Sequence, residues 1–563
     1  MRSTAGYRLL QQSGGVPLKV HEVLAEWLQA RGINTVFGLM GEANVQYLVD
    51  FIKVEGQQFI SCPHEGIAVS MADGYHRLSG KIGVASVTHG PALTNTLTAF
   101  TEAVRSRSEV LLITGSTPSE GRHLQAIDIA AIVAPTGAGY ERVASSSDVA
   151  SGADRALRQI ALERRPVVLD LPSDLLDREA ANEVRPFKLP STATSSPDQN
   201  ALDEALGMVV GARRPLVLAG RGAVVSAARD ALIELADLIG APLATTLLAK
   251  DFFRGHKRYV GICGTLSSSV GGSAIAGADC VVAFGASLNQ FTAGALAASA
   301  TIIHCDTDPS AIGAATPVNV GLVGDVRTTA ELMLEGLRNS GIDFSPGASS
   351  ELETAIASYS PHDDFEDING AETVDWRTAV VRLDSLLPPD RVVVTDTGRS
   401  VHAVWRYMHV TDPMNFVQTT NFASIGLGLG TAIGAAVGCP DQRVFAILGD
   451  GGFMMNVAGF STAVAYRIPL VVIVANDHAY GAEYRKLREY GADPKFSLSE
   501  WPDLARLAEV LGGQGITVRS APDLDRLPSL IADLAGPLLV DVRIDPSVDT
   551  DVVDLRALAA KMR

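Results

Sequence analysis

The chain has 563 residues, too many for one hydrophobic core, and 47% of them are hydrophobic and 19% charged, as in well-packed proteins of several domains. The formal net charge of −17 argues against nucleic acid and anionic membrane surfaces as partners, because both bind basic faces. No apolar run reaches the ~20 residues that a transmembrane helix needs, since charged residues interrupt the longest ones.

The first fifteen residues lack the apolar core of a signal peptide and are expected to form a terminal extension. Beyond them, short β-rich runs alternate with Gly-containing turns and Ala/Leu-rich amphipathic stretches, which predicts a parallel sheet covered by helices on both faces. The runs of this first segment are residues 34–39, 58–62, 82–90, 109–115 and 166–172. A Pro/Ser/Thr-rich stretch, residues 188–200, is predicted to be a linker.

Two further segments repeat the same alternation. The second segment has its β-rich runs at 214–224, 241–248, 280–287 and 300–309. An acidic, Ser/Pro-rich stretch, residues 345–372, reads as a second linker, and a third segment runs from 392–398 to 538–545. We therefore predict an α/β fold of three doubly wound parallel-sheet domains.

Two acidic residues follow two neighbouring apolar strands of the third segment. Asp450 lies in the GDGG motif after the strand that begins at Val444, and Asp477 ends the next strand. Parallel strands bring both carboxylates to one edge of a sheet, where they repel each other unless a cation lies between them. Oxygen ligands favour Mg²⁺ or a similar ion, which can also bind phosphate. The alternative is an ordinary Gly-rich turn, with Asp477 as a helix cap.

Together, GDGG (449–452) and ANDHAYG (475–481) resemble the signature of thiamine-diphosphate-dependent enzymes, Gly-Asp-Gly followed downstream by Asn-Asn. The resemblance spans residues 16–550 and is to the branch that contains acetohydroxyacid (acetolactate) synthase, oxalyl-CoA decarboxylase, 2-hydroxyacyl-CoA lyase and benzoylformate decarboxylase. It implies a pyrimidine-binding domain at 16–187, a central Rossmann-like domain at 198–340 and a diphosphate- and metal-binding domain at 372–550.

The resemblance implies thiamine diphosphate and Mg²⁺ as cofactors. The metal is expected to take Asp450, Asp477 and the backbone oxygen of Ala479. Asp477 replaces the second Asn of the family motif, which keeps an oxygen ligand and adds a negative charge.

Other stretches match cofactor-binding segments of the family. Glu65, in CPHEGIAVS, matches the Glu that contacts the pyrimidine N1′, although such an acid can also simply complement a helix dipole. Ile425 matches the bulky apolar residue beneath the bent cofactor, and its β-branched side chain is stiff. Arg399 can bind phosphate or face solvent. The remaining cofactor-binding candidates are Asn95, Gly398, Ser400, Gly449, Gly451, Gly452 and Tyr480.

Three further residues are candidates for contact with substrate. His89 follows an apolar strand and could move protons, because imidazole titrates near neutrality; a structural histidine is the alternative. Gln125 matches the Gln of an FQE segment in acetohydroxyacid synthases, with Ala126 in place of the Glu. Glu483 could act as an acid or base, or form an i,i+3 ion pair with Lys486 on a charged helix.

The central segment resembles the domain that holds FAD or ADP in relatives, so a nucleotide (FAD, ADP or CoA) is a further candidate ligand. Gly220, Gly222 and Asp306 match the general pattern. The turn GASLNQ (285–290) lacks the Arg and acids of the family's turn, which disfavours FAD and leaves a CoA-type nucleotide or an empty site.

The resemblance implies a C–C bond lyase or carboligase acting on a 2-oxo acid, similar to acetolactate synthase. A 2-hydroxyacyl-CoA lyase or oxalyl-CoA decarboxylase, acting on an acyl-CoA, is the alternative that Ala126, the altered turn and Glu483 favour. A non-catalytic subunit would not need Glu65 and both metal acids.

The resemblance also implies a homodimer or homotetramer, in which Glu65 meets the metal site across a subunit interface. Five separated cysteines without a CxxC pair predict reduced thiols and a cytoplasmic location.

Overall fold

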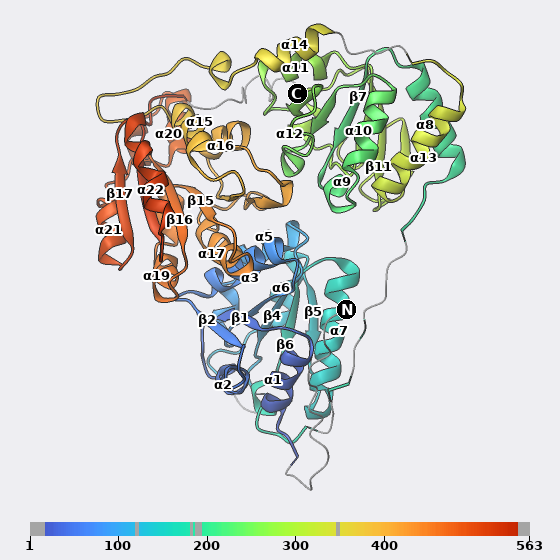
Figure 1. Ribbon diagram of the computed structural model, residues 1–563. Helices are drawn as coiled ribbons and strands as arrows, with labels where there is room; N and C mark the ends of the chain where they lie inside the picture. Colours follow the sequence, from blue (N-terminus) through green and yellow to red (C-terminus); the bar gives the residue numbers. More distant parts are fainter. Residues whose placement is uncertain are drawn as a thin grey trace. The chain divides into compact units, whose positions relative to one another are not determined.

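The structure is a computed structural model, and it describes residues 17–118, 123–180, 184–185, 188, 194–344 and 350–549. The predicted N-terminal extension, the predicted domain ends at 16, 187 and 550, and residues 189–193 and 345–349 of the two predicted linkers lie outside the described residues. The chain separates into two compact units (Figure 1). The first unit ends at residue 189 and the second begins at residue 190, apart from residues 77–79, which group with the second.

The first unit is built around one six-stranded sheet in the order β2-β1-β3-β4-β6-β5, and all its pairings are parallel. Its strands are β1 (Thr35–Gly38), β2 (Gln58–Ser61), β3 (Gly83–Ser86), β4 (Val110–Thr114), β5 (Gly139–Arg142) and β6 (Val167–Asp170). Its helices are α1 (Val20–Ala30), α2 (Val45–Ile52), α3 (Glu65–Ser79), α4 (Pro91–Thr94), α5 (Leu97–Arg105), α6 (Ile129–Val133) and α7 (Val149–Glu163).

The second unit contains two more six-stranded parallel sheets. The first has the order β12-β11-β10-β7-β8-β9. Its strands are β7 (Pro215–Ala219), β8 (Leu243–Thr245), β9 (Tyr259–Ile262), β10 (Cys280–Phe284), β11 (Thr301–Asp306) and β12 (Val320–Val323). The accompanying helices are α8 (Gln199–Gly211), α9 (Arg221–Val225), α10 (Arg229–Leu238), α11 (Ser269–Ala276), α12 (Gln290–Ala293), α13 (Val326–Asn339) and α14 (Ser350–Ser358).

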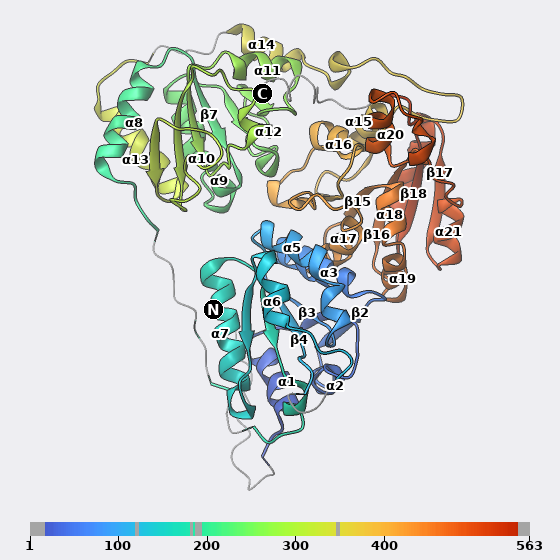
Figure 2. The same cartoon turned by 180° about the vertical axis from the view of Figure 1, so that it is seen from behind.

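The last sheet has the order β14-β13-β15-β16-β18-β17. Its strands are β13 (Val392–Thr395), β14 (Phe416–Gln418), β15 (Val444–Gly449), β16 (Leu470–Asn476), β17 (Gln514–Val518) and β18 (Leu538–Arg543). Its helices are α15 (Trp376–Leu386), α16 (Val401–Tyr407), α17 (Gly428–Gly438), α18 (Asp450–Met455), α19 (Ala458–Ala465), α20 (Gly481–Glu489), α21 (Leu504–Val510) and α22 (Leu527–Ala532). Helices cover both faces of the sheets, as the view from behind also shows (Figure 2). The predicted class, three doubly wound parallel-sheet domains, is confirmed.

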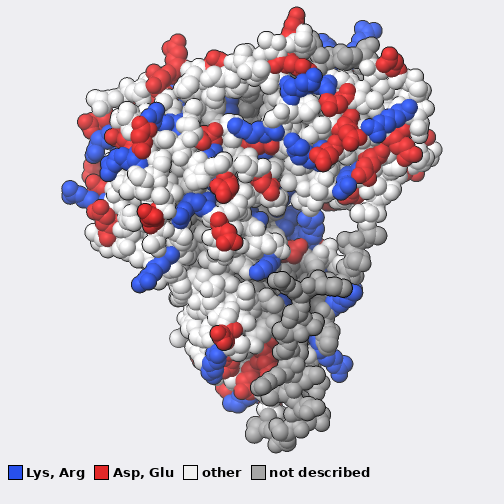
Figure 3. Space-filling view, in the orientation of Figure 1, with Lys and Arg blue, Asp and Glu red and all other residues white. Residues whose placement is uncertain are grey.

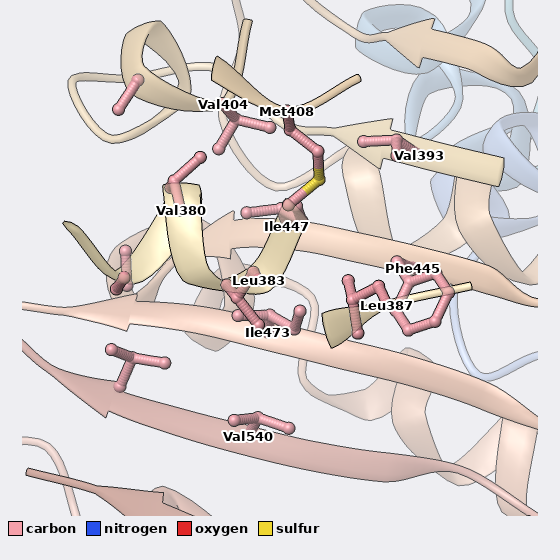
Figure 4. Close-up of a cluster of buried hydrophobic side chains, with 14 of the residues drawn as sticks. Val380, Leu383, Leu387, Val393, Val404, Met408, Phe445, Ile447, Ile473 and Val540 are labelled. Carbon is pink, nitrogen blue, oxygen red and sulfur yellow. The ribbon is translucent and has the colours of Figure 1, made fainter. Parts of the chain in front are cut away.

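A buried cluster fixes the strands of this last sheet. Alternate residues of a strand point to the same face, so Phe445 and Ile447 of β15 pack on the same side as Ile473 of β16. Val380 and Leu383 of α15 cover them (Figure 4). Each such side chain stabilises the fold by about 1.5–3 kcal/mol when fully buried. The cluster therefore holds β15 and β16 in the register that decides where the residues after them emerge.

The sequence analysis missed five strands, and all five lie at sheet edges: β5, β9, β12, β14 and β17. Four of them are only partly buried, because an edge strand has a neighbour on one side only. Their apolar runs are correspondingly short, which is why a search for continuous apolar stretches passes over them.

The described surface carries charges of both signs. On the face shown in Figure 3, Lys and Arg side chains are interspersed with Asp and Glu over much of the described surface. Among the residues that the structure describes, no helix is both long and apolar enough to cross a bilayer. All five cysteines are unpaired, and four of them are buried.

Candidate functional site

The last sheet reverses its chain order between two adjacent strands, β13 and β15. The strand that follows β13 in the chain, β14, lies on one side of this pair, and the strand that follows β15, β16, lies on the other side. The loops that follow such a pair of strands diverge, and ligands of open α/β sheets bind in the crevice between them. The candidate diphosphate and metal residues lie at this place.

Asp450 and Asp477 emerge side by side because of the strand register. Gly449 of β15 pairs with Ala475 of β16, so Asp450 follows its strand at nearly the same level as Asp477 follows the neighbouring one. Asp450 is 2% exposed and Asp477 is 8% exposed. The structure thus brings together the two acids that the sequence singled out.

Each carboxylate has few partners inside the protein. Asp450 accepts hydrogen bonds from the Gly451 backbone N–H at 2.8 Å and from the Trp501 indole at 3.0 Å. Asp477 accepts one from the Ala479 backbone N–H at 3.1 Å and pairs with Arg399, whose Nη2 lies 3.4 Å away. Among the residues that the structure describes, the two buried acids therefore share one ion pair, with Arg399.

The pKa values of the two carboxyl groups reflect this unfavourable burial and repulsion. Burial, and then repulsion by Asp477, raises the pKa of Asp450 to about 7. Burial also raises the pKa of Asp477 to about 6, although Arg399 acts in the opposite direction. A divalent cation between the carboxylates would relieve this repulsion, and two carboxylates with a backbone oxygen suit Mg²⁺. The residues therefore fit the metal, and their role as its ligands stays a prediction.

The neighbouring glycines make room for this arrangement. A Cβ on Gly452 would lie 2.3 Å from Oδ2 of Asp396, and one on Gly481 would lie 2.5 Å from Oδ2 of Asp477. A Cβ on Gly451 would lie 2.8 Å from Cε1 of Tyr480. Only glycine fits at these positions without a shift of the side chains around the acids.

Asp396 was missed by the sequence analysis, although it lies in the TDTGRS stretch. It is fully buried after β13 and accepts hydrogen bonds from the backbone N–H groups of Gly426, at 2.7 Å, and Gly428, at 3.3 Å. Burial raises its pKa to about 6, while the Gly426 N–H lowers it. Asp396 therefore pins the turn that carries Ile425, which is half-buried.

The other predicted cofactor residues lie around the same edge. Gly398 has a φ of +116°, which favours glycine. The Oγ of Ser400 lies 3.8 Å from where a Cβ on Gly449 would be. Tyr480 is 36% exposed, and its ring packs edge-on against Trp501. Ala479 is buried. The cofactor-binding roles of these residues stay predictions.

In the first unit the structure brings Glu65 and Asn95 together. Glu65 begins α3 and is 9% exposed, and Asn95 follows α4. Nδ2 of Asn95 donates a hydrogen bond of 3.0 Å to Oε2 of Glu65. This contact engages one carboxylate oxygen of Glu65, and its role toward a cofactor stays a prediction.

His89 and Gln125 also lie close together, beside a second histidine. The rings of His89 and His123 have their centroids 5.1 Å apart. A Cβ on Gly90 would lie 2.5 Å from the Gln125 backbone oxygen. Burial, and then the nearby His123, lowers the pKa of His89, while the Gln125 side chain acts in the opposite direction.

Three predicted residues, one on α20 and two in the central sheet, have ordinary structural surroundings. Glu483 is exposed on α20, and its carboxylate lies 3.6 Å from Nζ of Lys486, so the helix ion pair is present. In the central sheet, a Cβ on Gly220 would lie 2.2 Å from the Gly285 backbone oxygen, and Gly222 approaches the same residue. Close loop packing therefore accounts for these glycines without a nucleotide.

Besides Asp396, the sequence analysis missed Trp501, Glu42 and His123. Trp501 lies far from the strand ends in sequence and reaches Asp450 through a loop, which no local motif indicates. Glu42 follows β1 and His123 follows β4. The position of both residues after a predicted strand could have identified them, because the carboxyl ends of parallel strands lie at one edge of the sheet.

Comparison with known proteins gives three family matches. Residues 18–132 match the N-terminal TPP-binding domain of thiamine pyrophosphate enzymes, residues 202–333 match the central domain of these enzymes, and residues 396–542 match their C-terminal TPP-binding domain. The description of the central domain mentions no nucleotide, so the predicted FAD, ADP or CoA is unsupported.

The chain is also similar to curated proteins along most of its length. It is 27% identical to a probable acetolactate synthase large subunit of Methanococcus aeolicus, covering 93% of this chain and 92% of that one. It is 26% identical to the acetolactate synthase isozyme 3 large subunit of Escherichia coli, covering 93% and 95%. Among solved structures, it resembles the thiamine diphosphate-dependent 4-hydroxybenzoylformate decarboxylase of Rhodococcus jostii, with a TM-score of 0.77, 22% identity, and 94% and 99% of the chains covered.

The contact between Gly452 and Asp396 yields a stability prediction. Gly452→Ala should lower the free energy of unfolding by about 1–3 kcal/mol, because the new methyl group pushes the Asp396 carboxylate off the Gly426 N–H. Gly207→Ala is the matched control, since nothing lies within 4 Å of its Cβ position in α8. Thermal unfolding measures both variants; equal midpoints would contradict the packing described here.

Proposed function

We propose, from the premise that this chain belongs to the thiamine pyrophosphate enzyme family, that it is a Mg²⁺-dependent carboligase acting on 2-oxo acids, similar to acetolactate synthase. Acetolactate synthases are among the curated relatives that it matches over most of its length, and this supports the choice. The observation that carries the cofactor part of the proposal is the buried pair of Asp450 and Asp477 at the carboxyl edge of the last sheet.

The residues would divide the work as follows. Asp450, Asp477 and the backbone oxygen of Ala479 would hold Mg²⁺, and the loops with Gly398, Ser400 and Gly449–Gly452 would receive the diphosphate. Stiff Ile425, on the turn that Asp396 pins, would support the bent cofactor. When bound, thiamine diphosphate supplies a nucleophilic carbon and an electron sink for breaking or making the C–C bond beside a carbonyl.

Glu65 would hold and move a proton at the pyrimidine. Its Oε2 is engaged by Asn95 at 3.0 Å, so the proton is exchanged at Oε1. The Asn95 bond orients the carboxyl group, and its burial excludes water that would compete for the proton.

Arg399 was expected either to bind phosphate or to face solvent. It is 8% exposed and its Nη2 lies 3.4 Å from Oδ2 of Asp477, and its binding of phosphate stays a prediction. Asp477 carries a negative charge where the family motif has a neutral Asn, and Arg399 offsets that charge. The net charge offered to Mg²⁺ thereby approaches that of a single carboxylate with a neutral amide.

The proposal includes a homodimer or homotetramer in the cytoplasm. The resemblance supports this assembly, because in the family the residue matched by Glu65 and the metal-binding acids come from different subunits and meet at the interface between them. Five unpaired cysteines support a reducing compartment.

A substrate panel tests the function. The purified protein with thiamine diphosphate and Mg²⁺ is offered pyruvate, benzoylformate, oxalyl-CoA and a 2-hydroxyacyl-CoA. We expect turnover of a 2-oxo acid with formation of a new C–C bond. Turnover of CoA thioesters alone would replace the proposal by the lyase or decarboxylase alternative. Failure to bind thiamine diphosphate would favour a non-catalytic subunit.

Glu65→Gln should reduce kcat by at least about a hundredfold, the usual size of a general acid–base contribution, while thiamine diphosphate still binds. The amide keeps the size of the side chain and its bond to Asn95 but cannot exchange the proton. Steady-state kinetics and a cofactor titration measure the two effects. Glu55→Gln, at an exposed turn, is the control. A Glu65→Gln enzyme with unchanged kcat would remove Glu65 from this role.

Mg²⁺ affinity should depend on pH. The pKa of Asp450 is raised to about 7 and that of Asp477 to about 6, so protons occupy both carboxylates at lower pH and compete with the metal. The apparent affinity should therefore rise as the pH rises through 6 to 7 and level off above that range.

Mg²⁺ titrations in the presence of thiamine diphosphate, from about pH 5.5 to about pH 8, measure this dependence around the two raised values. Asp477→Asn leaves one titrating acid and should flatten the curve. A wild-type affinity that does not change over this range would contradict the assignment of the two acids.

A further inference from the structure

Three side chains of types that can bind a metal lie together at the carboxyl edge of the first sheet. Glu42 lies in the loop after β1, His89 in the loop after β3, and His123 in the loop after β4. Because β1, β3 and β4 are consecutive neighbours in the sheet, these loops emerge next to one another. The chain order reverses between β1 and β3, the place where open α/β sheets bind ligands.

The three side chains are close enough to share one ion. One potential ligand atom from each residue lies within 4.8 Å of the other two. His89 is 2% exposed, and its Nδ1 has no hydrogen-bond partner within the described part of the chain. An unpartnered buried nitrogen is unfavourable, and a ligand bound to it would relieve this cost.

Hydrogen bonds of two threonine hydroxyls join the loops that carry these residues. The Ala43 N–H donates to Oγ1 of Thr88 at 3.2 Å, and Oγ1 of Thr114 donates to the Thr88 carbonyl at 2.9 Å. Ala43 and Thr88 directly follow and precede Glu42 and His89. The backbone at Glu42 and His89 is therefore already held in place.

The third side chain can take part at little cost. Nδ1 of His123 accepts a hydrogen bond of 3.2 Å from the Gln125 backbone N–H, so that nitrogen carries a lone pair. An ion bound there would replace this one bond. Glu42 is exposed, and its carboxylate can turn toward the ion.

We infer that Glu42, His89 and His123 form a binding site for a divalent transition metal of the Zn²⁺ class. Two imidazoles and one carboxylate suit Zn²⁺ or Co²⁺, whereas Mg²⁺ prefers oxygen ligands alone. Three protein ligands leave a coordination position for water or a substrate oxygen. The site uses none of the residues assigned to Mg²⁺, and the inference does not depend on the proposed reaction.

Zn²⁺ binding to the whole chain tests this inference. Equilibrium dialysis is done in excess Mg²⁺ and thiamine diphosphate, so that the Asp450–Asp477 pair is occupied. We expect one Zn²⁺ per chain, bound at least tenfold more weakly by Glu42→Gln and by His123→Gln. His362→Gln, an exposed histidine of the other unit, is the control and should bind as the wild type does.

Co²⁺ provides a second measurement, because a site with two imidazoles and an open position absorbs visible light far more strongly than an octahedral site of oxygens. We expect this absorption in the wild type and its loss in both variants. Absence of Zn²⁺ uptake, or equal uptake by the wild type and both variants, would overturn the inference.

Discussion

Two carboxylates, those of Asp450 and Asp477, are buried side by side at the end of adjacent parallel strands, and the remaining features of the last domain are arranged around them. Burial and mutual repulsion make this pair unfavourable when both are ionised. A divalent cation bound between the two carboxylates would make the arrangement favourable and would also attract a diphosphate. In the proposed enzyme, this local instability would be relieved by the bound metal.

The position of the pair follows from the sheet. The buried residues of β15 and β16 set the strand register, and the register sets where the two acids emerge. Glycines at 451, 452 and 481 leave room for the side chains around the acids, and Asp396 holds the turn with Ile425 from the neighbouring strand. The position of the two acids at the sheet edge therefore depends on the packing of the hydrophobic core.

The sequence indicated the fold class and the two acids, because both depend on continuous apolar strands followed by polar residues. It could not indicate β5, β9, β12, β14 and β17, whose edge positions leave their patterns short. Trp501 was missed because it reaches Asp450 from a loop, which has no periodicity. The ion pair between Arg399 and Asp477 could not be predicted from the sequence, because the distance between the two side chains is a property of the folded chain. The sequence indicated which residue types follow the strands, but it did not indicate which side chains contact one another in the folded chain.

The most direct test of the account is anomalous diffraction from crystals grown with Mn²⁺, in place of Mg²⁺, and thiamine diphosphate. The account predicts one strong manganese peak in the last domain, within bonding distance of the carboxylates of Asp450 and Asp477. A cofactor bound without a peak between these carboxylates, or carboxylates that point away from each other, would contradict it.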